Sequence, residues 1–196
     1  MKKYQIVELS IEHNHAGSKA VQDVCDVAKN LGYEAKVIKT ATSIDSLWGK
    51  IRRQTLFFID WLKLYFSITP NSLVLIQNPY HHKQLIRNLV LSKLKRDKKV
   101  KFISLVHDVE ELRNSLYNDY YKNEFNFMLS IADSIIVHND KMKAFFTKKG
   151  ISENKLVSLK IFDYLMDKEA TSKNVIFERA ISIAGNLDIN KSAYIA

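Results

Sequence analysis

Cysteine is nearly absent from this chain, and its scarcity excludes two kinds of protein. Cys25 is the single cysteine among 196 residues. Neither a disulfide-stabilised framework nor a cysteine-rich metal site can therefore form within the chain. Cys25 also falls in a helical pattern of apolar residues, where we expect it to face the core. These features predict a protein of a reducing compartment, and we expect it in the cytoplasm.

Long apolar segments are also lacking. Glu8, Glu12 and His13 interrupt the N-terminal stretch, so the sequence predicts no signal peptide. Charged side chains likewise break the apolar pattern of residues 44–66 before it reaches the length of a membrane span. Core packing is expected to explain most of this helical pattern, and a peripheral contact with the inner face of the membrane or with a partner protein stays open. Its apolar stripe comprises Ile44, Leu47, Trp48, Ile51, Phe58, Ile59, Leu62 and Phe66, widened by Phe57, Trp61 and Leu64.

The common phosphate-binding and metal-binding motifs do not occur. Neither a P-loop nor a G-x-G-x-x-G sequence is present. The segment after the first predicted strand contains a single glycine, Gly17. A glycine directly before a helix lets backbone N–H groups approach a ligand closely, but it is equally typical of an ordinary strand-to-helix turn. The histidines show no H-E-x-x-H spacing, and no G-x-S-x-G nucleophile motif exists. We therefore expect no metal ion and no cofactor.

Acidic residues are fewer than basic ones, which gives a formal net charge of +9 and a pI near 9.4. Such a charge raises nucleic acid, anionic membranes and anionic ligands as partners. The densest basic run, residues 93–101, ends a predicted amphipathic helix, where cations complement the helix dipole. We favour that explanation over a dedicated binding patch. No nucleic-acid recognition motif accompanies the charge, and we expect no nucleic-acid partner.

What the chain does contain is a regular alternation of strand and helix patterns. Repeated units of this length predict an α/β fold, a Rossmann-like parallel sheet with helices on both faces. The predicted strands span residues 4–9, 34–38, 73–76, 102–106, 134–137 and 156–159. The predicted helices span residues 20–31, 44–66 with Ser43 as N-cap, 82–95, 120–132 and 141–149.

Polar side chains follow several of these strands at the point where each strand ends. The apolar run 102–106 stops at His107-Asp108, and His138-Asn139 follows the next strand. Asn78 ends the third strand. Because ligands bind at the carboxyl ends of parallel strands, this edge is predicted to be the functional one.

Four segments of the chain resemble a known group of enzymes. They are N-H-A-G-S-K-A (14–20), I-Q-N-P-Y (76–80), S-L-V-H-D-V-E-E-L-R (104–113) and A-D-S-I-I-V-H-N-D-K-M-K (132–143). Together they resemble the N-terminal half of GT-B glycosyltransferases. Within that fold they are most similar to bacterial galactofuranosyltransferase-like enzymes and to the glucosyltransferase that extends N-acetylglucosamine on serine-rich-repeat adhesins.

The resemblance also implies a domain organisation. Residues 1–166 are expected to form the acceptor-side Rossmann-like domain and residues 167–179 a linker. Residues 180–196, with a turn at Gly185-Asn186, would begin a truncated second domain that binds the nucleotide sugar. Since that domain holds most of the donor site in the resembling enzymes, this fragment alone is expected to be inactive.

The resemblance implies roles for particular residues in transfer of a hexose from a UDP-sugar to a glycan or glycoprotein, such as a GlcNAc-modified serine-rich-repeat adhesin. Asp108 or His107 is the candidate base if transfer inverts the anomeric centre. Alternatively, Asp108 caps a helical segment at 109–113, with Glu111 completing a capping box, and both roles can coexist. The expected donor-side residues are Ala16, Gly17, Gly185 and Asn186, and the expected acceptor-side residues are Asn78, His138 and Asn139.

Two other readings of the chain stay open. It could be a stand-alone module that binds a glycopeptide or a partner protein without catalysis, which predicts acceptor binding without any donor. A nucleic-acid-binding role rests on the positive charge alone and predicts affinity that falls steeply with salt. The donor sugar, the linkage stereochemistry and the oligomeric state, homo-oligomers included, are not encoded in any pattern of the sequence.

Overall fold

The computed structural model describes residues 1–9, 16–39, 46–79, 83–109 and 119–160. All of them belong to one compact unit, Met1–Tyr164. The predicted boundaries near 166 and 179, and the predicted turn at Gly185-Asn186, lie outside the described residues and stay predictions.

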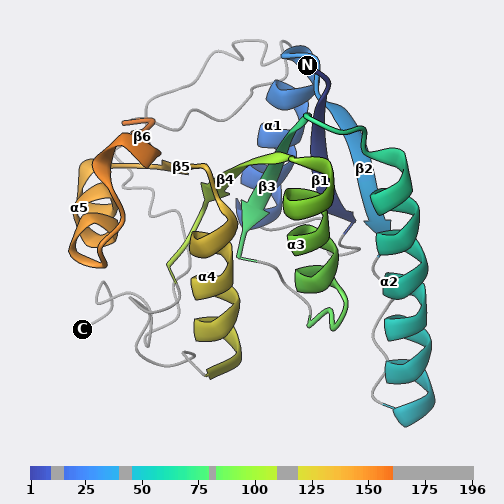
Figure 1. Ribbon diagram of the computed structural model, residues 1–196. Coiled ribbons are helices and arrows are strands. Elements are labelled where there is room, and N and C mark those ends of the chain that lie inside the picture. Colours follow the sequence, from blue (N-terminus) through green and yellow to red (C-terminus); the bar gives the residue numbers. More distant parts are fainter. Residues whose placement is uncertain (10–15, 40–45, 80–82, 110–118, 161–196) are drawn as a thin grey trace, which may run out of the picture. The chain divides into compact units, whose positions relative to one another are not determined.

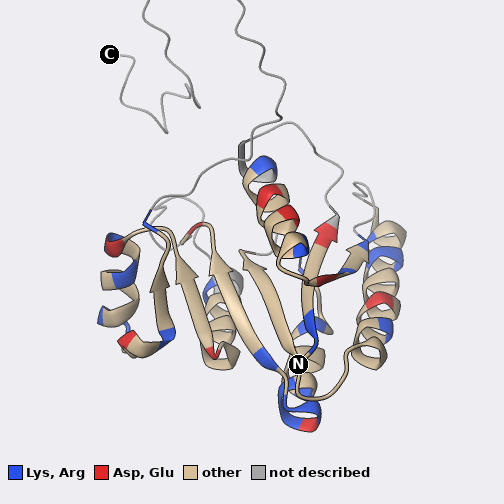
Figure 2. Cartoon of the chain, turned by 90° about the horizontal axis from the view of Figure 1, so that it is seen from above, with Lys and Arg blue, Asp and Glu red and all other residues tan. Residues whose placement is uncertain are grey.

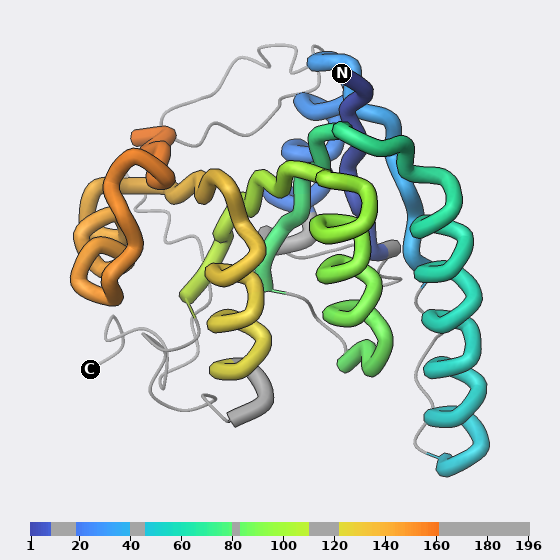
Figure 3. The backbone as a smooth tube through the Cα atoms, in the orientation of Figure 1, coloured from blue at the N-terminus to red at the C-terminus, as the bar shows by residue number. Residues whose placement is uncertain are grey.

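The described residues form a six-stranded sheet in the order β2-β1-β3-β4-β5-β6, with every neighbouring pair parallel. Strands and helices alternate along the chain, as Figure 3 traces. The strands are β1 Lys3–Leu9, β2 Glu34–Lys39, β3 Leu73–Asn78, β4 Lys101–Val106, β5 Ser134–Val137 and β6 Leu156–Ser158. The helices are α1 Ala16–Asn30, α2 Leu47–Ser67, α3 Arg87–Lys98, α4 Asp119–Ile131 and α5 Asp140–Lys148, with a short 3₁₀ turn at Glu153–Lys155.

Helices cover both faces of the sheet, and right-handed crossovers determine which helix lies on which face. The connection from β1 to β2 crosses the sheet in one direction, and the connections from β2 through β3 to β6 cross it in the other. Helix α1 therefore lies on one face of the sheet and α2 to α5 lie on the other face (Figure 1). Val24 and Ala28 of α1 pack on Leu75 and Leu105, whereas the larger core lies beneath α2 to α5. The predicted α/β Rossmann-like fold is confirmed.

The reversal of strand order falls between β1 and β3, and the two strands separate there. Their pairing ends at Gln5–Leu75, although β1 runs on to Leu9 and β3 to Asn78. In open α/β sheets the crevice outside such a switch point is where ligands bind. The fold therefore directs attention to the carboxyl ends of β1, β3 and the strands beside β3.

The basic run at the end of α3 stabilises the neighbouring helices. The Lys98 ammonium donates hydrogen bonds to the carbonyl oxygens of Tyr65 and Ile68, the latter at 2.7 Å, where α2 ends. Lys95 Nζ donates to the carbonyl oxygen of Ile131 at the end of α4, at 2.5 Å. Because α2 and α4 have no basic residue in their own last turns, these two lysines supply the cations that helix C-termini favour.

Helix α2 differs from its prediction in two respects. Its N-cap is Ser46 rather than Ser43, and the Ser46 hydroxyl accepts the N–H of Gly49 at 3.2 Å. Its buried face is formed by Phe57, Trp61 and Leu64, the residues expected only to widen the stripe. The members of the predicted stripe from Leu47 to Phe66 are exposed, because α2 turns its Phe57 side to the core, and Ile44 lies outside the described residues.

Helix α3 begins at Arg87, five residues after its predicted start at 82. Tertiary hydrogen bonds hold the preceding segment in a non-helical form. Gln54 Nε2 of α2 donates to the carbonyl oxygen of Lys83 at 2.8 Å, and the Gln84 side chain accepts from Trp61 Nε1 at 2.6 Å.

Candidate active site at the carboxyl edge of the sheet

Parallel register brings the ends of β3, β4 and β5 to one edge. Asn78 pairs with Val106, and Leu105 pairs with Ile136. The residues that follow β4 and β5, His107 and His138, therefore emerge side by side. Their ring centroids are 5.7 Å apart with the ring planes at 40°.

His107 is held in place by the end of β3. Its backbone N–H donates to the carbonyl oxygen of Asn78 at 2.8 Å, and its Nε2 lies 2.7 Å from Gln77 Oε1. The amide nitrogen of Gln77 faces α1, where it donates to the Val21 carbonyl oxygen and to Cys25 Sγ, each at 3.3 Å. Since Gln77 Oε1 can only accept, His107 Nε2 carries the hydrogen in this arrangement. Helix α1 thus orients His107 through Gln77.

His138 has a lowered pKa, and two effects act on it in opposite directions. Partial burial disfavours the charged imidazolium and dominates, whereas the nearby Asp108 carboxylate raises the pKa. The His138 ring is therefore neutral at neutral pH and able to exchange hydrogen bonds with hydroxyl groups. The influence of Asp108 on His138 also places these two predicted site residues in one electrostatic environment.

The structure brings together three of the predicted residues, His107, Asp108 and His138, all half-buried at this edge. Such a cluster supplies a carboxylate acceptor and two imidazoles within reach of one small ligand. The alternative role of Asp108, as the cap of a helical segment at 109–113, concerns residues 110–113 and lies outside the described residues.

The two predicted asparagines have different surroundings. Asn78 is buried, and its Nδ2 donates to the Ser104 hydroxyl at 2.8 Å, which ties β3 to β4. Asn139 is exposed and is the N-cap of α5, with its Oδ1 accepting the N–H of Met142 at 2.9 Å. Acceptor binding by either residue stays a prediction, and the exposed Asn139 is better placed for it.

The predicted donor-side residues are only partly described. Ala16 and Gly17 are the first two residues of α1, so backbone N–H groups of a helix start lie at this end of the helix. Gly185 and Asn186 lie outside the described residues. The donor-side role of all four stays a prediction.

Sequence reasoning missed a hydrogen-bonded chain at the end of β1. The Trp61 indole N–H donates to Gln84 Oε1, and Gln84 Nε2 in turn donates to the carboxylate of Glu8. In the sequence, Glu8 stood out only as a charge that interrupts an apolar stretch. Its position near the end of the first strand was the signal that could have identified it. Glu8 places a second carboxylate at the carboxyl edge, next to the switch point.

The described residues contain neither a metal-binding cluster nor a membrane-spanning helix. No group of three or more histidine, cysteine or acidic side chains lies close enough together there to hold a metal ion. None of the helices in the described ranges has the length and apolarity that crossing a membrane requires. The expectation that no metal is needed stays a prediction.

A parallel sheet whose strand order reverses between β1 and β3, with helices on both faces, defines a Rossmann-like domain. Residues 3–161 match the family model "Glucosyltransferase 3-like, N-terminal domain", and the chain belongs to this family. It is 28% identical over 198 residues to "Beta-1,6-galactofuranosyltransferase WbbI" of Escherichia coli (strain K12), an alignment that covers 98% of this chain and 54% of the relative. The chain thus spans about half the length of that curated relative. The predicted resemblance to glycosyltransferase N-terminal domains is confirmed.

Proposed function

We propose that this chain is the acceptor-side domain of a glycosyltransferase that transfers a hexose from a UDP-sugar to a hydroxyl group of a glycan or glycoprotein. The supporting observation is the cluster of His107, Asp108 and His138 at the carboxyl edge, in a chain whose family is a glycosyltransferase family. The cluster offers a base and hydrogen-bonding groups at the edge where α/β folds bind ligands.

The proposed reaction needs one proton acceptor. In transfer with inversion, the acceptor oxygen bonds to the anomeric carbon while the bond from that carbon to the diphosphate breaks, and the bonding pair leaves with UDP. The hydroxyl proton passes to Asp108 or to His107. With Nε2 donating to Gln77, Nδ1 is the basic nitrogen of His107. Neutral His138 would orient a sugar hydroxyl beside them.

The donor would be bound chiefly outside the described residues. The first turn of α1, at Ala16 and Gly17, is proposed to face the diphosphate, since backbone N–H groups at a helix start favour anions. Gly185 and Asn186 would contribute from the second domain. On this proposal the 196-residue chain alone binds UDP weakly and turns over no donor.

Several finer features, which rest on the resemblance and on the composition and motifs of the sequence, are proposed with it. They are a bacterial origin, a cytoplasmic location, transfer without a metal ion, and a GlcNAc-modified serine-rich-repeat adhesin as one acceptor. Assembly into homo-oligomers is a further open question that light scattering of the chain in solution would answer.

The proposal is tested by titrating glycan acceptors into the chain while imidazole resonances are followed by NMR. We expect His107 and His138 to shift with a glycan acceptor present and no donor, whereas UDP alone produces little change. Unchanged His107 and His138 resonances at saturating glycan acceptor would contradict the proposal. If acceptor binding is found but a longer form with a second domain transfers no sugar, the stand-alone binding module is the better description.

A further inference from the structure

One face of α2 is apolar and exposed to solvent. Side chains at the helical spacings i, i+3 and i+4 form what we call the α2 stripe: Leu47, Trp48, Ile51, Phe58, Leu62 and Phe66. Trp48 is 81% exposed and Phe66 is 77% exposed, although both are among the most apolar side chains. The stripe is distinct from the face that packs on the core, where Phe57 and Trp61 are completely buried. Contiguous exposed apolar surface of this kind marks an interaction site.

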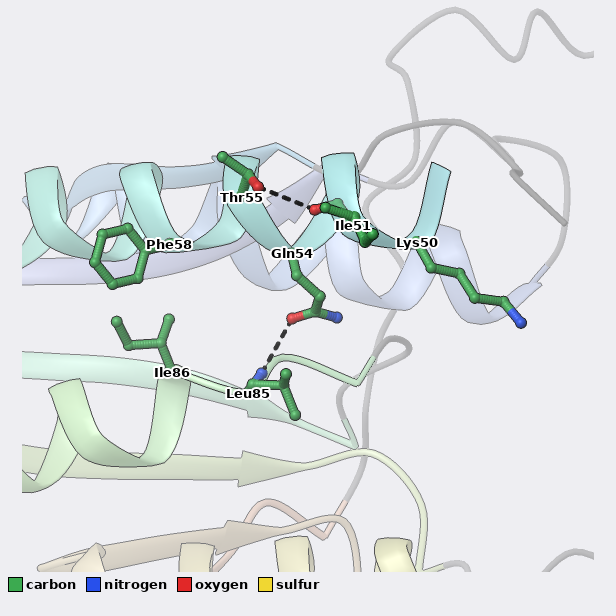
Figure 4. A pocket seen from close by; sticks show the side chains of 7 residues that line it. All are labelled: Lys50, Ile51, Gln54, Thr55, Phe58, Leu85 and Ile86. Carbon is green, nitrogen blue, oxygen red and sulfur yellow. Dashed lines mark hydrogen bonds between the residues drawn. The ribbon is translucent and has the colours of Figure 1, made fainter. Parts of the chain in front are cut away.

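The stripe continues across a groove onto the segment before α3. An open cavity of about 530 Å³ lies between Ile51 and Phe58 of α2 and Leu85, which is itself 69% exposed (Figure 4). Gln54 fixes the two walls, because its Oε1 accepts the N–H of Leu85 at 3.3 Å. The apolar surface therefore extends over two rigidly connected elements.

Positive charge borders the stripe. Lys50, Arg52 and Lys63 are exposed on α2, and basic residues recur along this helix in Figure 2. The single acidic residue of α2, Asp60, lies toward β2, where its carboxylate accepts the N–H of Lys39 at 2.9 Å. An apolar face with a cationic border is the pattern of helices that lie in the interface of an anionic membrane.

We propose that the α2 stripe docks this domain on the surface of an anionic lipid bilayer, with α2 lying parallel to the membrane plane. The 21 residues of α2 extend over about 30 Å. Trp48 and Phe66 would enter the headgroup region near the two ends, and the bordering cations would contact lipid phosphates. The docking itself does not depend on the proposed sugar chemistry.

Charge complementarity selects the bilayer over a second copy of the chain. In a dimer with two-fold symmetry the same patch meets itself. The exposed Lys50, Arg52 and Lys63 would then lie near the same cations of the other copy, while Asp60 is bound to β2. Anionic lipid neutralises them instead. Because α2 begins at the carboxyl edge of the sheet, docking would hold the candidate active site close to acceptors carried on a membrane.

The proposal is tested by flotation of the complete chain with vesicles. We expect the chain to float with equal mixtures of phosphatidylglycerol and phosphatidylcholine, and to stay behind with phosphatidylcholine alone. Trp48→Ser and Phe66→Ser should each lower the partition coefficient about tenfold. Arg52→Gln and Lys63→Gln should each lower it about fivefold at low salt.

Matched controls separate the stripe from general effects of charge and apolarity. Leu31→Ser removes an apolar side chain that is 61% exposed at the end of α1, and Lys141→Gln removes an exposed cation on α5. Both controls should float like the unaltered chain, and all six variants should keep its thermal midpoint without vesicles. Equal loss in the controls, or no flotation of the unaltered chain, would overturn the proposal. The proposal would also be overturned if the chain formed an oligomer whose mass fell with Trp48→Ser, because a second copy of the chain would then cover the stripe.

Discussion

Replacing Glu124 by glutamine should destabilise the domain strongly, because Glu124 balances a buried positive charge. The Arg87 guanidinium is 1% exposed and forms a salt bridge with the Glu124 carboxylate, across α3 and α4. Asn88 completes the arrangement, since its Oδ1 accepts from Arg87 Nε at 3.1 Å and its Nδ2 donates to Glu124 Oε1 at 2.9 Å. Glu124→Gln keeps the shape of the side chain and removes its charge.

The magnitude follows from burial. Removing one partner of a buried pair costs about 3–5 kcal/mol, and the partial exposure of Glu124 favours the lower end, about 3 kcal/mol. A domain of this size has about 5–15 kcal/mol of stability in total, so the loss is a large fraction of it. The thermal midpoint should fall by roughly 6–12 °C, at about 2–4 °C for each kcal/mol.

The assay is denaturant unfolding followed by circular dichroism, with a double variant as the control. Arg87→Met combined with Glu124→Leu removes both charges and should recover most of the lost stability, because neither charge is then buried alone. A cost below about 1 kcal/mol for Glu124→Gln would refute the reasoning, since that is the range of exposed ion pairs.

Two other predictions concern His138 and Trp61. The lowered pKa of His138 means that the unfolded chain binds its proton more readily, so this group makes stability fall as pH drops below the ordinary value of 6.5. Unfolding between about pH 5 and pH 7 should show a shallower pH dependence in His138→Gln, and an unchanged dependence would contradict the assignment. Trp61→Phe removes the indole donor to Gln84 and should cost about 1–2 kcal/mol in denaturant unfolding. Trp61 is buried and Trp48 is exposed. Trp61→Phe should therefore leave the red-shifted fluorescence of Trp48, and Trp48→Phe should leave the blue-shifted fluorescence of Trp61. The reverse pattern would show that α2 is turned the other way.

The sequence predicted the order of elements well because the strands are strongly patterned. The strand at 134–137 matches β5 at both ends, and the run 102–106 lies within β4. Buried parallel strands are short apolar runs, and local composition is enough to identify them.

The face of α2 could not be predicted in the same way. This helix has two apolar faces, and the periodicity of the sequence alone does not indicate which of them packs against the core. The answer depends on Trp61 meeting Gln84, a residue 23 positions away. The late start of α3 has the same origin, since Gln84 is held by side chains of other elements.

The candidate site was predictable in outline and not in its supporting contacts. Polar residues after apolar strands identified His107, Asp108 and His138. The contacts of Gln77 and Glu8 were not identified, because each residue acts through partners distant in the sequence. Gln77 links α1 to His107, and Glu8 accepts from Gln84.

The most direct test of the central proposal is sugar transfer by Asp108→Asn in a form of the protein that includes a second, nucleotide-sugar-binding domain. If the carboxyl edge is the active site, Asp108→Asn removes either the base itself or the carboxylate that acts on His138. Turnover should then fall by about 10²- to 10⁴-fold while acceptor binding persists. His107→Gln, measured in parallel, distinguishes the two candidate bases by the larger loss. Near-normal transfer by both variants would contradict the placement of the active site at His107 and Asp108.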